Sequence, residues 1–130
     1  MTVFLIGLFL AFYATRAFYT VDMYKDEFLI TELAVIEDPH AWWAWHCRAM
    51  KRFDNKSFRE ALIFWVIAKT ISPREFKLYI NIAVCLGLMG NKPEGDSYVK
   101  RAAENIVPGQ EKEANEIIKA YWEGKMPILL

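Results

Sequence analysis

The sequence predicts an all-α protein, in which one hydrophobic N-terminal helix precedes about six helices that form a short repeat. Three observations predict this fold. Pro39, Pro73 and Pro108 recur at nearly equal intervals in the sequence. The residues between them carry apolar side chains at the i, i+3, i+4, i+7 spacing of amphipathic helices. Ser57 and Ser72 each precede a glutamate by three positions, which is the capping-box pattern of a helix start.

Length and composition favour one compact domain over a multidomain chain. The 130 residues suffice for a single domain and an anchor, and 55% of them are hydrophobic. The 16 basic residues equal the 16 acidic ones, so no charge imbalance points to nucleic acid as a partner. Cys47 and Cys85 lack metal-binding spacing, and we expect small buried side chains, with a disulfide between them left open.

Residues 1–21 are expected to form a single-pass transmembrane anchor, followed by a helical domain at 22–130. Residues 2–14 contain no charge. A bilayer core about 30 Å thick needs about 20 apolar residues in a helix, so the segment spans only if Arg16 reaches the interface and the nearby aromatic residues lie among the headgroups. A buried core helix and a cleaved signal peptide are the alternatives, and the basic n-region of a signal peptide is absent.

The first full repeat is predicted between residues 42 and 75. Its two helices are expected at 41–53 and 58–71, with a polar break between them. Trp45 and Trp65 supply large side chains to the space between the helices, while small residues let the backbones approach. These small residues are Ala49, Ala61 and Ala68.

A second repeat is predicted between residues 75 and 108. Its first helix carries an apolar stripe, and Gly90 stands where a glycine ends a helix. Gly95 replaces an alanine of the pattern and is expected to weaken its helix by about 1 kcal/mol. The stripe consists of Tyr79, Ile82, Ala83 and Leu86.

Two flanking helices complete the predicted array. Residues 22–37 have the pattern of the second half of a repeat, closed by Pro39. Residues 110–123 have one apolar face and are followed by Gly124 as a stop signal. An array of repeats needs such end helices because the last repeat would otherwise expose its core.

Over positions 28–120 the chain resembles tetratricopeptide-repeat proteins, whose unit is a helix–turn–helix of about 34 residues. Two consecutive units in register carry the resemblance, with Ala61 at a small packing position and Pro73 closing the first unit. The resemblance implies a right-handed superhelix of helical hairpins. Arg48 and Arg52 depart from the family pattern, because leucine and tyrosine are common at these positions.

A looser resemblance covers the whole chain. The hydrophobic segment, Arg16 after it, the acidic and aromatic stretch at 22–28 and the half repeat closed by Pro39 are similar to the C-terminal end of membrane O-mannosyltransferases that carry tetratricopeptide repeats. This resemblance would imply an accessory or terminal part of a membrane glycosyltransferase. The catalytic region of that family has no counterpart here, so no catalytic residue is assigned.

The tetratricopeptide resemblance also implies a binding groove, because the first helices of the repeats line the concave face of such an array. The positions that would face a partner are mostly apolar, and an apolar groove accepts a peptide or a partner helix. They are Trp43, His46, Met50, Phe53, Lys77, Ile80 and Val84. The alternative is that the terminal helix or the membrane-proximal helix covers this face.

Together these features predict a membrane-anchored scaffold that binds a protein partner, or a small subunit of a larger membrane complex. The alternative is the accessory or C-terminal part of a membrane glycosyltransferase. No enzyme is expected, because His40 and His46 and the serines and cysteines lack a nucleophile or metal-ligand context. We likewise expect no cofactor, no metal site and no nucleic-acid partner.

Overall fold

The computed structural model describes residues 6–7, 10–16 and 27–125. Within these ranges all regular structure is helical, which confirms the all-α prediction. Residues 10–16 are helical, and six longer helices follow in order. They are α2 (Glu27–Glu37), α3 (Trp42–Asp54), α4 (Phe58–Ile71), α5 (Phe76–Leu88), α6 (Lys92–Glu104) and α7 (Glu111–Trp122).

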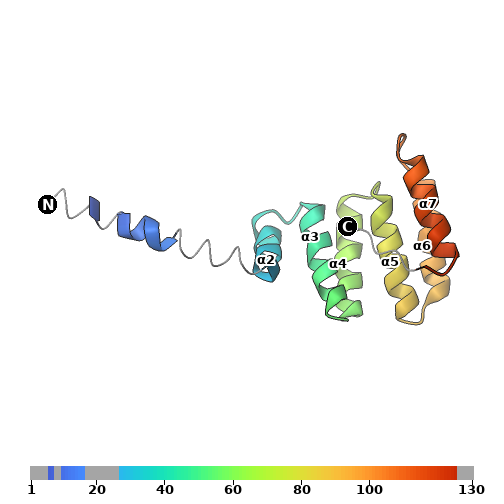
Figure 1. The fold of residues 1–130 in the computed structure, drawn as a ribbon, viewed down its shortest axis with the longest axis horizontal. Helices are drawn as coiled ribbons and strands as arrows, with labels where there is room; N and C mark the ends of the chain where they lie inside the picture. Colours follow the sequence, from blue (N-terminus) through green and yellow to red (C-terminus); the bar gives the residue numbers. More distant parts are fainter. Residues whose placement is uncertain (1–5, 8–9, 17–26, 126–130) are drawn as a thin grey trace.

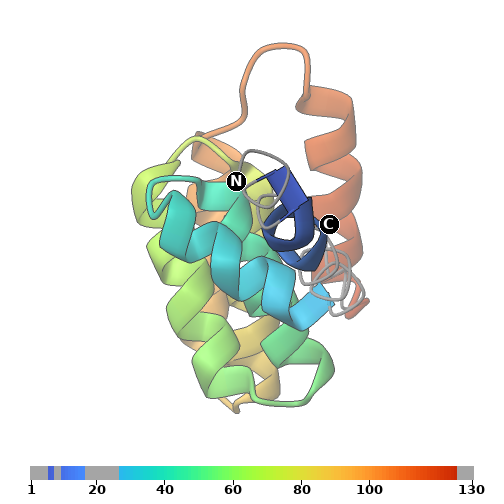
Figure 2. The same ribbon diagram turned by 90° about the vertical axis from the view of Figure 1, so that its left-hand side faces the viewer.

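The helices pack as antiparallel pairs in a single row (Figure 1). Helices α3 and α4 form one hairpin, and α5 and α6 form the next. Helix α2 packs against α3 at one end of the row, and α7 packs against both α5 and α6 at the other. Figure 2 looks along the row from the α2 end, with α7 farthest from the viewer.

The repeat period of the sequence is also a period of the structure. The two hairpins begin at Trp42 and Phe76, so their starts have the same spacing as Pro39 and Pro73. The same hydrogen bond recurs at the entry to each hairpin, where an aromatic side chain donates to the carbonyl of the proline that closes the preceding unit. Trp45 Nε1 donates to the carbonyl oxygen of Pro39 at 2.8 Å. Tyr79 donates its hydroxyl to the carbonyl oxygen of Pro73, also at 2.8 Å.

Small residues lie where the helices of the first hairpin touch, as the sequence predicted. Ala49, Ala61 and Ala68 are all fully buried, and they surround Trp65, which is fully buried as well. Burying a large apolar side chain completely stabilises the fold by about 1.5–3 kcal/mol. The small alanine side chains therefore leave the space that the ring of Trp65 fills, and burial of that ring stabilises the fold.

Gly95 has a different role from the one its helix propensity suggests. A Cβ atom at this position would lie 2.8 Å from the carbonyl oxygen of Ala83 and 3.2 Å from the hydroxyl oxygen of Tyr121. Residue 95 must therefore lack a side chain for α5 and α6 to approach, and for Tyr121 of α7 to reach between them. The expected weakening of α6 is offset by this close packing.

Tyr121 links that close approach to the terminal helix. Its hydroxyl donates a hydrogen bond to Asp96 of α6 at 2.9 Å, and the ammonium group of Lys92 lies 5.4 Å from the centre of its ring. Nearer the beginning of α7, Glu113 pairs with Lys77 of α5. Helix α7 is thus attached near both of its ends, and it belongs to the folded core.

Arg48 and Arg52, which depart from the repeat pattern, join three helices. Glu32 of α2 accepts a hydrogen bond from Arg48 Nε at 2.8 Å, and a second Arg48 nitrogen pairs with the other carboxylate oxygen. Arg52 lies 3.3 Å from the same carboxylate and 2.8 Å from Glu60 of α4. The Arg48 guanidinium carbon is also 4.5 Å from the ring centre of Phe64. These contacts give α2 a charged attachment to the first hairpin besides its apolar one.

Most of the predicted anchor at 1–21 lies outside the described residues. Among the residues that the structure describes, no helix is both long enough and apolar enough to cross a membrane. In the helical stretch at 10–16, Leu10, Phe12 and Tyr13 each leave more than half of their surface exposed.

A pair of glycine substitutions tests the packing at residue 95. Gly95→Ala is expected to lower the free energy of unfolding by about 1–3 kcal/mol, because its Cβ would push α5 and α6 apart. Gly87→Ala is the matched control, since nothing lies within 4 Å of a Cβ there. It is expected to stabilise the protein by up to about 1 kcal/mol. Urea denaturation followed by circular dichroism measures both effects, and stabilisation by both substitutions would show that the close approach at Gly95 is absent.

Candidate partner-binding surface

Lys77 of α5 interacts with charged or titratable residues of the other first helices of the array, α3 and α7. Its ammonium group lies 2.9 Å from a carboxylate oxygen of Glu113 on α7. The charge of Lys77 also acts on His46 of α3, whose pKa is lowered first by burial and then by this charge. Lys77 of α5 therefore interacts electrostatically with a residue of each of the other two first helices.

The seven predicted groove residues fall into three groups by exposure. His46, Ile80 and Val84 are buried, whereas Met50, Phe53 and Lys77 are half-buried. Trp43 leaves 54% of its surface exposed. The structure therefore leaves one of the seven exposed and buries three of them in the core.

Helix α7 accounts for the burial of Ile80 and Val84. Both residues belong to a core cluster that includes Ala114 and Tyr121 of α7. The half-buried Ile117 and Ile118 of that helix pack against the same cluster. The alternative in which a terminal helix covers the groove therefore holds along α5. An apolar face that α7 already covers offers no free surface to a partner.

His46 is a buried hydrogen-bond acceptor. Its Nδ1 accepts a hydrogen bond from Trp65 Nε1 at 3.1 Å, so this nitrogen carries no proton. Burial, and secondarily the charge of Lys77, lowers the pKa of His46 below its ordinary value of 6.5. The neutral ring thus supports Trp65 inside the hairpin and leaves no exposed histidine at this position.

Phe53 is likewise occupied within the hairpin. Its ring centre is 5.2 Å from that of Phe58 and 5.7 Å from that of Trp65. These separations are typical of paired aromatic rings, so Phe53 joins α3 to α4. Its contribution to a partner surface is limited to the edge that remains exposed.

The surface that remains is a stripe along α3, formed by Trp43, Cys47, Met50 and Asp54, which we call the α3 stripe. Its members are four, seven and eleven positions beyond the first, the spacing of one helix face. Cys47 is half-buried and forms no disulfide. Burial raises the pKa of its thiol, although Lys51 opposes the shift. The prediction missed Cys47, but its spacing from Trp43 and Met50 was the signal that could have identified it.

The other cysteine is separated from this surface. Cys85 is buried, and its thiol donates to the carbonyl oxygen of Phe58 at 3.0 Å. Burial raises its pKa to about 11, so the thiol stays protonated at neutral pH. Both cysteines are thus free thiols, and the disulfide left open by the sequence is not formed.

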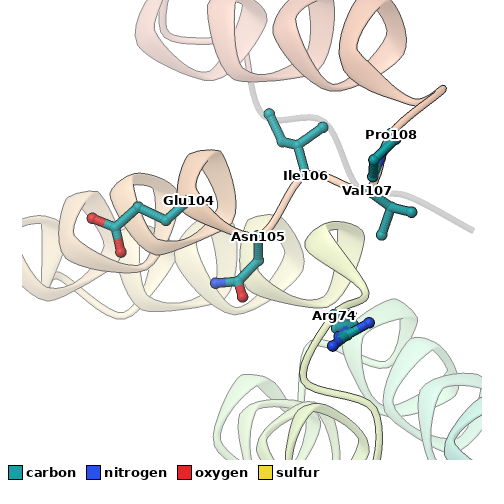
Figure 3. A pocket seen from close by; sticks show the side chains of 6 residues that line it. All are labelled: Arg74, Glu104, Asn105, Ile106, Val107 and Pro108. Atoms are coloured by element: carbon teal, nitrogen blue, oxygen red, sulfur yellow. The ribbon is translucent and has the colours of Figure 1, made fainter.

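A shallow pocket of about 250 Å³ lies elsewhere, where the α4–α5 loop faces the end of α6 and the α6–α7 loop (Figure 3). Its charged lining residues, Arg74 and Glu104, are both exposed to solvent. Its remaining walls are Asn105, Ile106, Val107 and Pro108. The charges are solvated and none of the lining residues is buried, so the chemistry of the pocket does not specify a ligand.

Within the described residues, no three His, Cys, Asp or Glu side chains come together in a way that could hold a metal ion. No protein-family model matches the chain, and no curated protein resembles it significantly. The α3 stripe is thus the candidate site that the geometry provides.

The buried state of His46 generates a prediction about pH. Because its pKa is lower in the folded protein, the unfolded chain binds more protons below about pH 6.5, and stability falls as the pH falls. The loss is at most about 1.4 kcal/mol per pH unit for this residue. In His46→Asn the amide oxygen can accept the Trp65 hydrogen bond without titrating. The variant is therefore expected to lose less stability than the wild type between about pH 7.5 and about pH 5.5.

The exposed His40 provides the control. His40→Asn is expected to retain the pH dependence of the wild type, as measured by urea denaturation at both pH values. Equal losses in the wild type and in His46→Asn would contradict a neutral, buried His46.

Proposed function

We propose that this chain is a short tetratricopeptide-like module that binds an apolar segment of a protein partner through the α3 stripe, and that residues 1–21 hold it at a membrane. The observation that carries the proposal is the 54% exposure of Trp43 on a helix whose neighbouring face is buried. Tryptophan is the residue type in which the binding energy of interfaces concentrates most strongly. An exposed tryptophan beside other apolar groups is the pattern of an interaction site.

The repeat architecture supports the module assignment. The two hairpins share one sequence period, buried alanines at their contacts and the same aromatic-to-proline hydrogen bond. That period and helix–turn–helix unit are those of tetratricopeptide repeats. Arrays of this kind present extended surfaces to partners, which is consistent with a binding role.

The dimensions of the α3 stripe favour a helix or a short peptide as the partner. Trp43 and Asp54 are eleven positions apart, or roughly 16 Å along a helix at about 1.5 Å per residue. About three turns of a partner helix would match that length. Trp43 and Met50 provide the apolar contacts, and the exposed Asp54 provides a polar group at the end of the stripe.

The membrane part of the proposal rests on the sequence. Residues 2–14 are free of charge, and the exposed apolar side chains at 10, 12 and 13 would be better accommodated in lipid than in water. With such an anchor, partner binding by the α3 stripe would take place close to the membrane.

The first test of this function compares two tryptophans of similar exposure. Trp122 on α7 is 48% exposed, against 54% for Trp43. Trp43→Ala is expected to cost about 2 kcal/mol or more of binding energy, or roughly 30-fold in affinity, while Trp122→Ala leaves partner binding unchanged. The measurement is recovery of proteins that co-purify with the full chain in mild detergent, together with the melting temperature of each variant.

Full recovery of partners by a stable Trp43→Ala variant would exclude the α3 stripe as the site. Equal losses in both variants would point to nonspecific contact through exposed aromatic rings. Met50 also packs against the core cluster of the first hairpin. Met50→Asp therefore probes the same stripe only where its melting temperature stays that of the wild type, since a charge there would oppose an apolar partner.

A second test examines the anchor. Alkaline carbonate extraction is expected to leave the full chain in the membrane pellet, because an inserted helix is not released by removing peripheral contacts. A variant that begins at Asp22 is expected in the supernatant. Release of the full chain together with the shortened one would exclude residues 1–21 as an anchor.

A further inference from the structure

The outer side of the second helices of the repeats, α2, α4 and α6, becomes more polar along the array. Positions one repeat period apart can be compared directly because the hairpins keep that period. At one outer position the residue changes from Ile36 to Thr70 to Glu104, all of them exposed. Three positions earlier in each helix, apolar side chains at 33 and 67 give way to an arginine at 101. The outer side is therefore apolar at α2 and charged at α6.

The central charge of α2 is paired within the protein. Glu32 is the one charged residue between Glu27 and Glu37, and it pairs with two arginines of α3. Leu33 is half-buried and Ile36 is 74% exposed. A helix with apolar residues on its outer side as well as its inner side is normally buried on both sides, by protein or by a membrane.

The opposite end of the row shows what a solvated end helix looks like in this chain. The side of α7 that faces away from the core is polar along most of its length, with Trp122 at its end as the exception, which suits an end in contact with water. Its exposed polar residues there include Lys112, Asn115, Glu116 and Lys119. The two ends of the array, α2 nearest the viewer and α7 farthest away in Figure 2, therefore differ in the polarity of their outward-facing residues.

Given the anchor of the proposed function, the distance along the chain keeps α2 close to the membrane. Residues 22–26 join the anchor to the start of α2 at Glu27. At no more than about 3.6 Å per residue, this connection keeps the start of α2 within roughly 20 Å of the membrane. The exposed Glu37 and Asp38 next to Ile36 would repel anionic lipids. Contact must then come from apolar insertion and not from charge.

We propose that the outer face of α2, formed by Leu33 and Ile36, lies in the interfacial layer of the lipid bilayer. The array would then stand with its α2 end on the membrane and its α7 end in water. The proposal rests on the anchor but adds a second, separable contact between the protein and the bilayer. Apolar side chains of a helix that lies on a membrane are buried in this layer in the same way.

The experiment uses the full chain in a nanodisc of phosphatidylcholine, with a nitroxide label at one introduced cysteine. Cys47→Ala removes the half-buried thiol, and Cys85 can stay because it is buried and its pKa is about 11. The labelled variants are Ile36→Cys and two controls at the equivalent positions, Thr70→Cys and Glu104→Cys. Power-saturation electron paramagnetic resonance compares collisions with oxygen, which partitions into lipid, and with a water-soluble nickel chelate.

The ratio of oxygen to nickel accessibility is expected to be several-fold higher at position 36 than at position 104, with position 70 between them. Equal ratios at all three positions, in a chain that enters the nanodisc, would overturn the membrane contact of α2 and leave the anchor intact. A label at 36 that is shielded from both reagents would overturn it too, because a protein surface would then cover α2. Failure of the full chain to enter the nanodisc would instead exclude the anchor, and the contact of α2 with it.

Discussion

Helix α5 is enclosed by its neighbours, and the rest of the array is arranged to enclose it. From Phe76 to Leu86 every residue except Lys77 is buried. Helix α4 covers one side, α6 another, and α7 the side that would otherwise form a groove. This enclosure depends on the approach of α6 at Gly95, where a single added carbon would meet the carbonyl of Ala83. The core of the second repeat therefore depends on a close contact between backbones.

The position of α7 confines the candidate partner surface to α3. The two sides of the array differ in where their apolar residues are exposed. The side of the first helices keeps one partly exposed stripe around Trp43, whereas the outer side of the second helices becomes more polar from α2 to α6. A partner on the first side and a lipid surface at α2 would not compete for the same residues. The salt bridges of Glu32 with Arg48 and Arg52 fix α2 and α3 relative to each other, and so connect the two surfaces mechanically.

Local features of the sequence determined the helices and their period. Hydrophobic spacing and regular prolines act within one or two turns, so the predicted helix at 58–71 matches α4, and the one at 41–53 differs from α3 by one residue at each end. The predicted capping boxes are not formed: Ser57 precedes α4 without a side-chain capping hydrogen bond, and Ser72 ends α4 while α5 begins only at Phe76. Buried alanines were predictable for the same reason, because a repeated small residue marks a helix contact wherever the repeat recurs. The membrane anchor and the protein partner stay proposals, because a run of apolar residues suits a lipid and a protein environment equally well.

Contacts between distant residues decided what each face of these helices does. Burial of Ile80 depends on the docking of α7, which comes much later in the chain, and the packing role of Gly95 depends on Ala83 and Tyr121. The pairing of Glu32 with Arg48 likewise joins separate helices. Helix formation follows from neighbours along the chain, but exposure depends on which other helix lies across each face. That information exists only once the chain has folded.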